Sequence, residues 1–159
     1  MPRPIPILFT IPNFITAGSG MVLFNIVSRL NREKFAPSVC VLRKGGALEP
    51  EFERLKVPLF EAPFTVQPRP YLSLWLRARR AAKVFRPHGF ALWQSWHYSD
   101  DYTEPIIARL AGTKAWVYTK KAMGWGSRAW LLRSLLATRI AVDNSEMPDM
   151  LFNKWGLRS

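Results

Sequence analysis

The sequence predicts an α/β fold: a doubly wound, mainly parallel sheet of six or seven strands with helices on both faces. Short, nearly continuous apolar runs recur along the 159 residues, as in strands that are buried on both faces. Segments of helix length, with apolar residues at helical spacing, separate these runs. Glycine and proline stand at the junctions. Six such alternations indicate parallel strands joined by helical crossovers.

The first half begins with the apolar run 5–11, which ends at Pro12. The small residues of 16–20 form a loop before the first helix, and Pro50 lies near the start of the second helix, where proline is tolerated. The expected elements are, in order, a strand over 5–11, a helix over 21–30, a strand over 39–42, a helix over 48–55 and a strand over 57–60.

The second half follows a proline-punctuated loop over 63–70. Ser145 is a suitable N-cap for a last helix. The expected elements before it are a helix over 71–85, a strand over 90–95, a helix over 103–111, a strand over 115–118, a helix over 127–137 and a strand over 140–142. One apolar face of the helix over 71–85 is formed by Tyr71, Leu74, Trp75, Ala78, Ala82 and Phe85. In the helix over 127–137 we expect four leucines in the core, namely Leu131, Leu132, Leu135 and Leu136.

Neither a linker nor a repeat divides residues 1–159, so we expect a single domain. Apolar stretches are interrupted well before about 18 residues, and the start lacks the apolar region of a signal peptide. Cys40 is the one cysteine, which excludes an internal disulfide and a cysteine-based metal site. We therefore expect a cytoplasmic protein without a bound metal or cofactor.

The net charge is +12, and the excess is localised. No acid lies between Glu61 and Asp100, or between Glu104 and Asp143. Such a surface attracts nucleic acid, anionic lipid headgroups or phosphorylated substrates, and the charge alone does not choose among them. A merely solvated basic surface is the plain alternative.

In a doubly wound sheet the site lies at the carboxyl ends of the strands, where strands one and four diverge. This rule selects the loops after Ile11, Ser95 and Tyr118. In the first loop, the backbone amides of Gly18, Ser19 and Gly20 can approach an anion at a helix N-terminus. The alternative is a tight turn with positive φ at a glycine. The loop lacks the glycine pattern of a nicotinamide dehydrogenase.

Polar and aromatic residues follow the fourth strand. His97 is the one catalytic candidate, and Trp96, Tyr98 and Asp101 beside it suit a hydroxyl-rich ligand such as a sugar. Alternatively, Trp96 and Tyr98 pack in the interior and Asp101 caps the next helix; for Asp101 we favour the cap.

After the fifth strand, Lys120 and Lys121 can neutralise a ligand phosphate, and Gly124 gives the loop freedom to move and line an acceptor cleft. Further along lies a candidate membrane face, in which tryptophan and arginine suit the headgroup layer. Its residues are Arg128, Trp130 and Arg133.

In their order and spacing these pieces resemble the N-terminal, Rossmann-like domain of family-4-type GT-B glycosyltransferases, over nearly the whole chain. The resembling segments are Ile7–Pro12, Gly18–Gly20, Val22–Asn25, Leu30, Lys34–Phe35, Val39–Arg43, Gly45–Gly46, Leu55–Pro58, Gln94–Trp96, Ala108–Gly112 and Arg139–Ser145. Members of this family join two such domains around a cleft, use a nucleotide-diphosphate sugar without a metal, and retain anomeric configuration.

The resemblance implies that Gly18–Gly20 faces the donor diphosphate and the acceptor, and that His97 and Lys120–Lys121 line the cleft. Ser19 departs from the family, where many members have a second glycine. The donor-gripping residues belong to a C-terminal domain that we expect to be absent here. The expected function is therefore the acceptor-binding half of a retaining glycosyltransferase, inactive alone, with a nucleotide sugar and a glycan or glycolipid acceptor as partners.

Two alternatives stay open. One is a non-enzymatic basic α/β module that binds nucleic acid or anionic membrane; specific nucleic-acid binding is not expected, because no reading motif is present. The other is a scaffold whose second half is a separate polypeptide. For the glycosyltransferase we expect a cytoplasmic location, peripheral on the inner face of the membrane.

Overall fold

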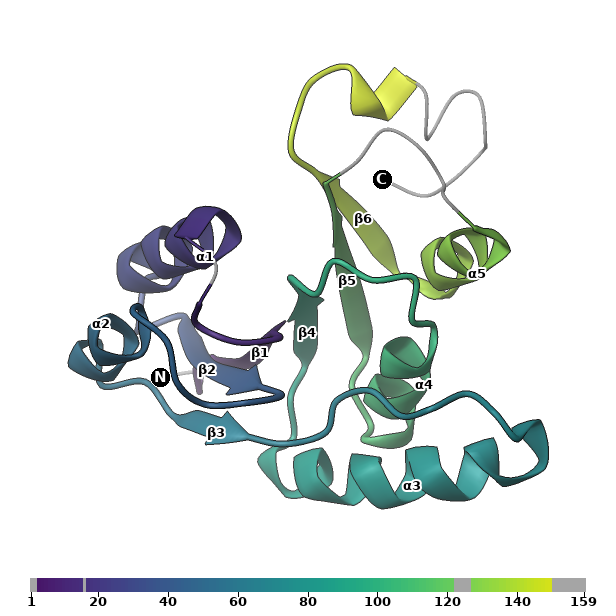
Figure 1. Ribbon diagram of the computed structural model, residues 1–159. Coiled ribbons are helices and arrows are strands. Elements are labelled where there is room, and N and C mark those ends of the chain that lie inside the picture. The colour runs from purple at the N-terminus through teal and green to yellow at the C-terminus, as the bar shows by residue number, and fades with distance from the viewer. Residues whose placement is uncertain (1–2, 16, 122–126, 150–159) are drawn as a thin grey trace.

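The fold is a six-stranded, wholly parallel sheet in the order β3-β2-β1-β4-β5-β6 (Figure 1). It is seen in a computed structural model that describes residues 3–15, 17–121 and 127–149. The strands are β1 (Ile5–Ile11), β2 (Phe35–Val41), β3 (Leu59–Glu61), β4 (Leu92–Ser95), β5 (Ala115–Lys120) and β6 (Arg139–Val142). This is the doubly wound order, so the fold predicted from the sequence is confirmed.

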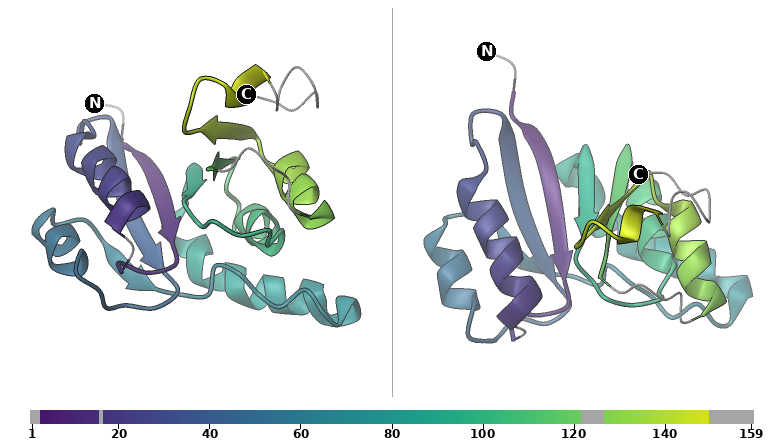
Figure 2. Two further views of the ribbon diagram at one scale, coloured as in Figure 1. Left: turned by 45° about the horizontal axis from the view of Figure 1, so that its top comes forward. Right: turned by 90° about the horizontal axis from the view of Figure 1, so that it is seen from above.

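Helices cover both faces of the sheet (Figures 1 and 2). They are α1 (Ala17–Arg29), α2 (Glu49–Arg54), α3 (Leu74–Phe85), α4 (Thr103–Leu110) and α5 (Arg128–Leu136), with short 3₁₀ turns η1 (Tyr71–Ser73) and η2 (Arg86–His88). On one face, α1 and α2 pack on β1 and β2 through buried side chains such as Leu23 and Phe52. On the other, α3 and α4 pack on β1, β4 and β5 around Phe85, Trp93 and Ile107. Within the described ranges, no helix is both long and apolar enough to cross a bilayer.

Several boundaries differ from the prediction, and the largest differences are at α1 and β2. Helix α1 begins at Ala17 rather than at Met21, so the expected glycine loop is its first turn. Strand β2 begins at Phe35 rather than at Val39, because β1 offers seven residues and pairs from Ile5 with Phe35 onward. The expected helix after Ser145 lies mostly beyond the described residues, and Asn144 caps its start by accepting from the amides of residues 146 and 147.

The apolar face expected for α3 is only partly buried. Ala78, Ala82 and Phe85 are in the core, whereas Tyr71 and Trp75 are 62% and 55% exposed. The first turns of α3 project past α4 and therefore lose contact with the sheet (Figure 1). The exposed residues therefore lie on the apolar helix face that the sequence indicates, at its N-terminal end.

Candidate functional site

The three loops selected from the sequence meet at Lys121, just beyond the end of β5. Its Nζ donates to Ser19 Oγ at 2.6 Å and to the carbonyl oxygen of Trp96 at 3.0 Å. Ser19 lies in the first turn of α1, after β1, and Trp96 follows β4. The convergence of the β1, β4 and β5 ends is thus confirmed as geometry, at the switch point between β1 and β4. We call this place, formed by Ser19, Trp96, His97 and Lys121, the strand-tip site.

Residues 17–20 form the first turn of α1, and the backbone amides of a helix N-terminus are in general suited to an anion. Gly18 is exposed, and nothing lies within 4 Å of where a Cβ would stand. A Cβ on Gly20 would lie 2.5 Å from Leu48 Cδ1, so glycine lets α1 approach the segment before α2. Neither residue has positive φ, so the tight-turn alternative was wrong.

Lys121 places a second positive charge beside the positive end of the α1 dipole. The lysine is half-buried; burial lowers its pKa, and the nearby Asp143 carboxylate works against that shift. Lys121 Nζ lies 2.6 Å from Ser19 Oγ in the first turn of α1, so an anion bound here would compensate both the ammonium and the helix dipole. The strand-tip site is therefore suited to a phosphate or carboxylate.

Lys120 does not share this role, contrary to the prediction. Strand β5 runs two residues further than expected, to Lys120, and successive side chains of a strand point to opposite faces. The Lys120 side chain is buried, with Nζ 5.0 Å from the ring centroid of Trp130, and burial lowers its pKa. Of the two lysines, it is Lys121 that reaches the strand-tip site.

His97 follows Trp96, whose carbonyl oxygen accepts from Lys121, and its ring stands edge-on to Phe64 with 5.6 Å between centroids. Its Nδ1 is buried and has no hydrogen-bond partner among the described residues. Burial lowers the pKa of His97, and the Glu104 carboxylate opposes that shift. The imidazole is therefore neutral at pH 7 and can accept a hydrogen bond or a proton.

The other expected cleft residues have structural partners. Asp101 Oδ1 accepts from the amides of Thr103 at 2.8 Å and Glu104 at 3.2 Å, so the capping interpretation is confirmed. Trp96 is 5% exposed in the apolar cluster under α1, and Lys121 Nζ both donates to its carbonyl oxygen and lies 5.6 Å from its ring centroid. Tyr98 is half-exposed with its ring 5.1 Å from Trp130. Gly124 lies outside the described residues.

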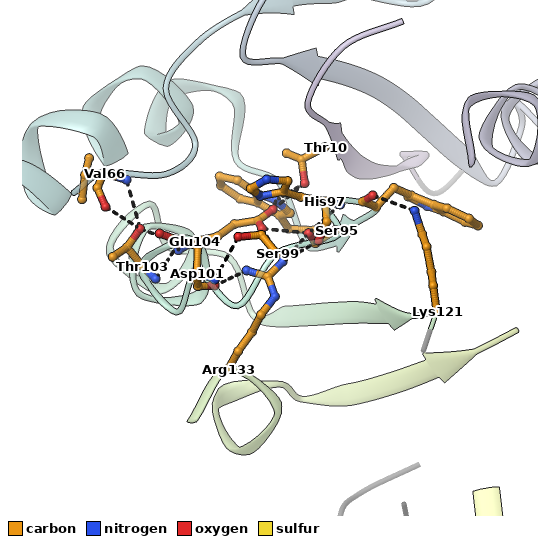
Figure 3. Close-up of polar contacts among 12 residues, drawn as sticks. Thr10, Val66, Ser95, His97, Ser99, Asp101, Thr103, Glu104, Lys121 and Arg133 are labelled. Atoms are coloured by element: carbon orange, nitrogen blue, oxygen red, sulfur yellow. Dashed lines mark hydrogen bonds and ion pairs between the residues drawn. The ribbon is translucent and has the colours of Figure 1, made fainter. Parts of the chain in front are cut away.

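A buried ion pair under the strand-tip site was not predicted. Arg133 Nη2 contacts Glu104 Oε2 at 2.8 Å, and both side chains are fully buried (Figure 3). The carboxylate also accepts from Thr10 Oγ1 at 2.5 Å, Trp93 Nε1 at 3.1 Å and Ser95 Oγ at 2.7 Å. We call these five residues the Glu104 cluster. In the sequence, the signal for this cluster was a polar residue at or next to the end of an apolar strand run, namely Thr10 and Ser95.

The Glu104 cluster holds the loop that carries His97. Arg133 donates to the carbonyl oxygens of Asp101 and His97, the latter at 3.3 Å, and to Ser95 Oγ at 2.8 Å. Its guanidinium also lies over the rings of Trp116 and Tyr118, at 5.0 and 4.9 Å. The backbone after β4 is therefore fixed from beneath by one side chain of α5 (Figure 3).

This ion pair overturns the predicted membrane face. Arg133 is buried, Trp130 is half-buried against Tyr98 and Tyr118, and of the three only Arg128 is exposed. Conversely, Leu132 and Leu135, expected in the core, are 41% and 62% exposed. Helix α5 turns its arginine inward because the buried Glu104 carboxylate requires a cation.

The lowered pKa of His97 predicts a loss of stability in mild acid. In the unfolded chain the histidine takes up a proton near its ordinary pKa of about 6.5, whereas the folded protein does so only at lower pH. The free energy of unfolding in urea should therefore fall between pH 7.5 and 5.5, and less so in His97→Gln. His88→Gln, at the exposed second histidine, serves as the control; an equal flattening there would contradict the prediction.

Comparison with known proteins gives a likeness of fold. No protein-family profile and no curated protein matches this sequence. A solved structure does: MurG of Acinetobacter baumannii, a GT-B glycosyltransferase, at a TM-score of 0.62 and 10% identity. The match covers 91% of this chain and 42% of MurG, so the chain spans less than half of that protein's length. Sheet order and this match together show a Rossmann-like α/β fold of the GT-B type.

Proposed function

We propose that this chain is the acceptor-binding half of a glycosyltransferase that transfers a sugar from a nucleotide-sugar donor to a glycan or glycolipid acceptor. The observation that carries the proposal is Lys121, whose ammonium joins the loops after β1, β4 and β5 at the first turn of α1. The GT-B-like fold supports it, because in doubly wound sheets this edge is where ligands bind.

In this proposal each group has a chemical task. The α1 amides and Lys121 hold a phosphate of the acceptor or the donor, and His97 accepts a hydrogen bond or the proton of the attacking acceptor hydroxyl. The Glu104 cluster keeps the His97 loop in place. Retention of anomeric configuration and family-4-type chemistry come from the sequence resemblance, as does a second domain that grips the nucleotide. For residues 1–159 by themselves we expect no detectable transfer, because the donor contacts would come from that second domain.

Amide chemical shifts test the proposal in the chain as it stands. Inorganic pyrophosphate and a water-soluble, short-chain lipid-diphosphate saccharide should both shift the amides of Ser19 and His97, because they place phosphate at the strand-tip site. Lys121→Met should weaken both ligands by about tenfold, the loss of one charge-assisted contact. Lys114→Met removes an exposed lysine at the opposite edge of the sheet and should leave binding unchanged.

Two outcomes would contradict this function. One is binding of either ligand with shifts that avoid Ser19 and His97. The other is no binding of the saccharide together with salt-sensitive binding of nucleic acid that Lys121→Met leaves intact, which would support the basic-module alternative. A gel-shift titration at two salt concentrations measures the latter.

A further inference from the structure

Four large, exposed apolar side chains of the described chain gather where α3 begins. Leu72 in η1 is 99% exposed, and Tyr71, Trp75 and Leu76 are 62%, 55% and 58% exposed. We call these four residues the α3 tip. Single exposed apolar residues are ordinary, but four large ones within six positions form a patch of the kind that marks an interaction surface.

The exposed side of α3 divides along its length into an apolar part and a basic part. Positions 72, 75, 76, 79, 80 and 83 follow helical spacing and lie on one face. The first three are Leu72, Trp75 and Leu76, and the next three are Arg79, Arg80 and Lys83, all exposed. The inner face of the helix is formed by Ala78, Ala81, Ala82 and Phe85, which are buried.

The α3 tip is held rigidly from behind. Arg77 donates to the carbonyl oxygens of Gln67 at 2.8 Å and Pro70 at 3.0 Å, and to Ser73 Oγ at 2.5 Å. Thr103 at the start of α4 pairs with both backbone groups of Val66, at 3.0 and 3.2 Å. These bonds fix the chain before and within η1, so the apolar residues are displayed in a preformed arrangement that binding need not order.

The α3 tip also lies toward the carboxyl ends of the strands, which is the end of the sheet that carries the strand-tip site. A crossover helix runs antiparallel to its strands, so α3 starts at their carboxyl ends. Figure 2 shows this end of α3 projecting beyond the neighbouring helices in both views. Between the tip and α4 lies a mainly apolar groove of about 460 Å³, lined by Tyr71, Leu74, Trp75, Ile106, Arg109 and Leu110.

We propose that the α3 tip docks this protein on an anionic lipid bilayer. Leu72, Trp75 and Leu76 enter the boundary between headgroups and acyl chains, and Arg79 and Arg80 then meet lipid phosphates about one helical turn behind. The charge pattern selects lipid as the occupant, because no acid occurs between Glu61 and Asp100 to repel an anionic surface. The inference does not depend on sugar transfer, although docking at this edge would bring the strand-tip site to a lipid-linked acceptor.

Vesicle sedimentation tests the proposal with two matched pairs of variants beside the wild type. Wild type should bind vesicles of phosphatidylglycerol and phosphatidylcholine, and less so as salt rises. Leu72→Ser/Leu76→Ser should weaken binding at least about tenfold, because two buried leucines are lost. Leu132→Ser/Leu135→Ser, two exposed leucines of α5, is the matched control and should bind as wild type does.

A second pair of variants tests the contribution of the basic residues behind the α3 tip. Arg79→Gln/Arg80→Gln should weaken binding to the anionic vesicles roughly tenfold or more, at about 1 kcal/mol per cation near the surface. Lys34→Gln/Lys114→Gln removes two exposed charges at the opposite edge of the sheet and should have a much smaller effect. Quenching of tryptophan fluorescence by brominated lipid should fall most in Trp75→Phe.

Three results would overturn the proposal. The first is that each α3-tip variant binds vesicles as well as its matched control does, which indicates general charge attraction without docking through the α3 tip. The second is no vesicle binding by folded wild type. The third is a concentration-dependent dimer in ultracentrifugation that Leu72→Ser/Leu76→Ser abolishes, with no vesicle binding, which would make a second copy the occupant. Failure here leaves pyrophosphate binding at the strand-tip site untouched, so the two proposals fail separately.

Discussion

Replacing Arg133 with methionine is expected to lower the free energy of unfolding by about 3–5 kcal/mol, because it leaves the Glu104 carboxylate buried without its cation. In a chain of this size that corresponds to a melting temperature lower by about 10 °C. The loop carrying His97 should also loosen, because the contacts of Arg133 with Ser95 Oγ and with the carbonyls of Asp101 and His97 are lost together. Urea denaturation and hydrogen exchange of residues 96–101 measure the two effects.

Two further variants separate charge from packing. Glu104→Gln/Arg133→Met removes both charges, while the amide oxygen can still accept from Thr10 and Trp93 and the amide NH2 can donate to Ser95 Oγ; it should recover more than half of the lost stability. Arg128→Met, at an exposed arginine on the same helix, should change stability by less than about 0.5 kcal/mol. If Arg133→Met were as stable as Arg128→Met, the ion pair would contribute nothing to the fold.

Substituting alanine for Gly46 is expected to cost about 3 kcal/mol or more. Gly46 has φ of +125°, which side chains rarely adopt, and a Cβ there would lie 2.5 to 2.7 Å from the backbone of Phe14 and Ile15. These backbone atoms cannot move aside as the end of a flexible side chain can. The segment that would be displaced leads into α1, so the contact between Ser19 and Lys121 should weaken as well.

Gly45→Ala is the matched control for that prediction. Gly45 also has positive φ, +101°, but nothing lies within 4 Å of its Cβ position. It should therefore cost only the backbone strain, roughly 1–2 kcal/mol. Equal destabilisation by the two substitutions, measured by thermal unfolding, would show that the close approach to Phe14 is unimportant. Loss of pyrophosphate binding in Gly46→Ala alone would tie this contact to the strand-tip site.

Much of the site geometry was predictable because parallel sheets follow strict topological rules. The apolar run 5–11 is β1 with the same bounds, and the order of elements requires the ends of β1, β4 and β5 to be neighbours. From this alone, Ser19, His97 and Lys121 were placed at one edge. The start of α1 was missed because glycines with ordinary helical φ look like a loop in sequence.

The sequence by itself determined the doubly wound sheet and the place where the ends of β1, β4 and β5 meet, since apolar periodicity and crossover handedness are local and general. The tertiary structure alone decided which polar side chains are buried and which apolar ones are not. Glu104 and Arg133 are fully buried because they compensate each other across α4 and α5, a pairing 29 residues apart that no periodicity encodes. Leu72 and Trp75 are exposed because the start of α3 extends past the elements that would have covered them. Burial depends on neighbours that only the folded chain supplies.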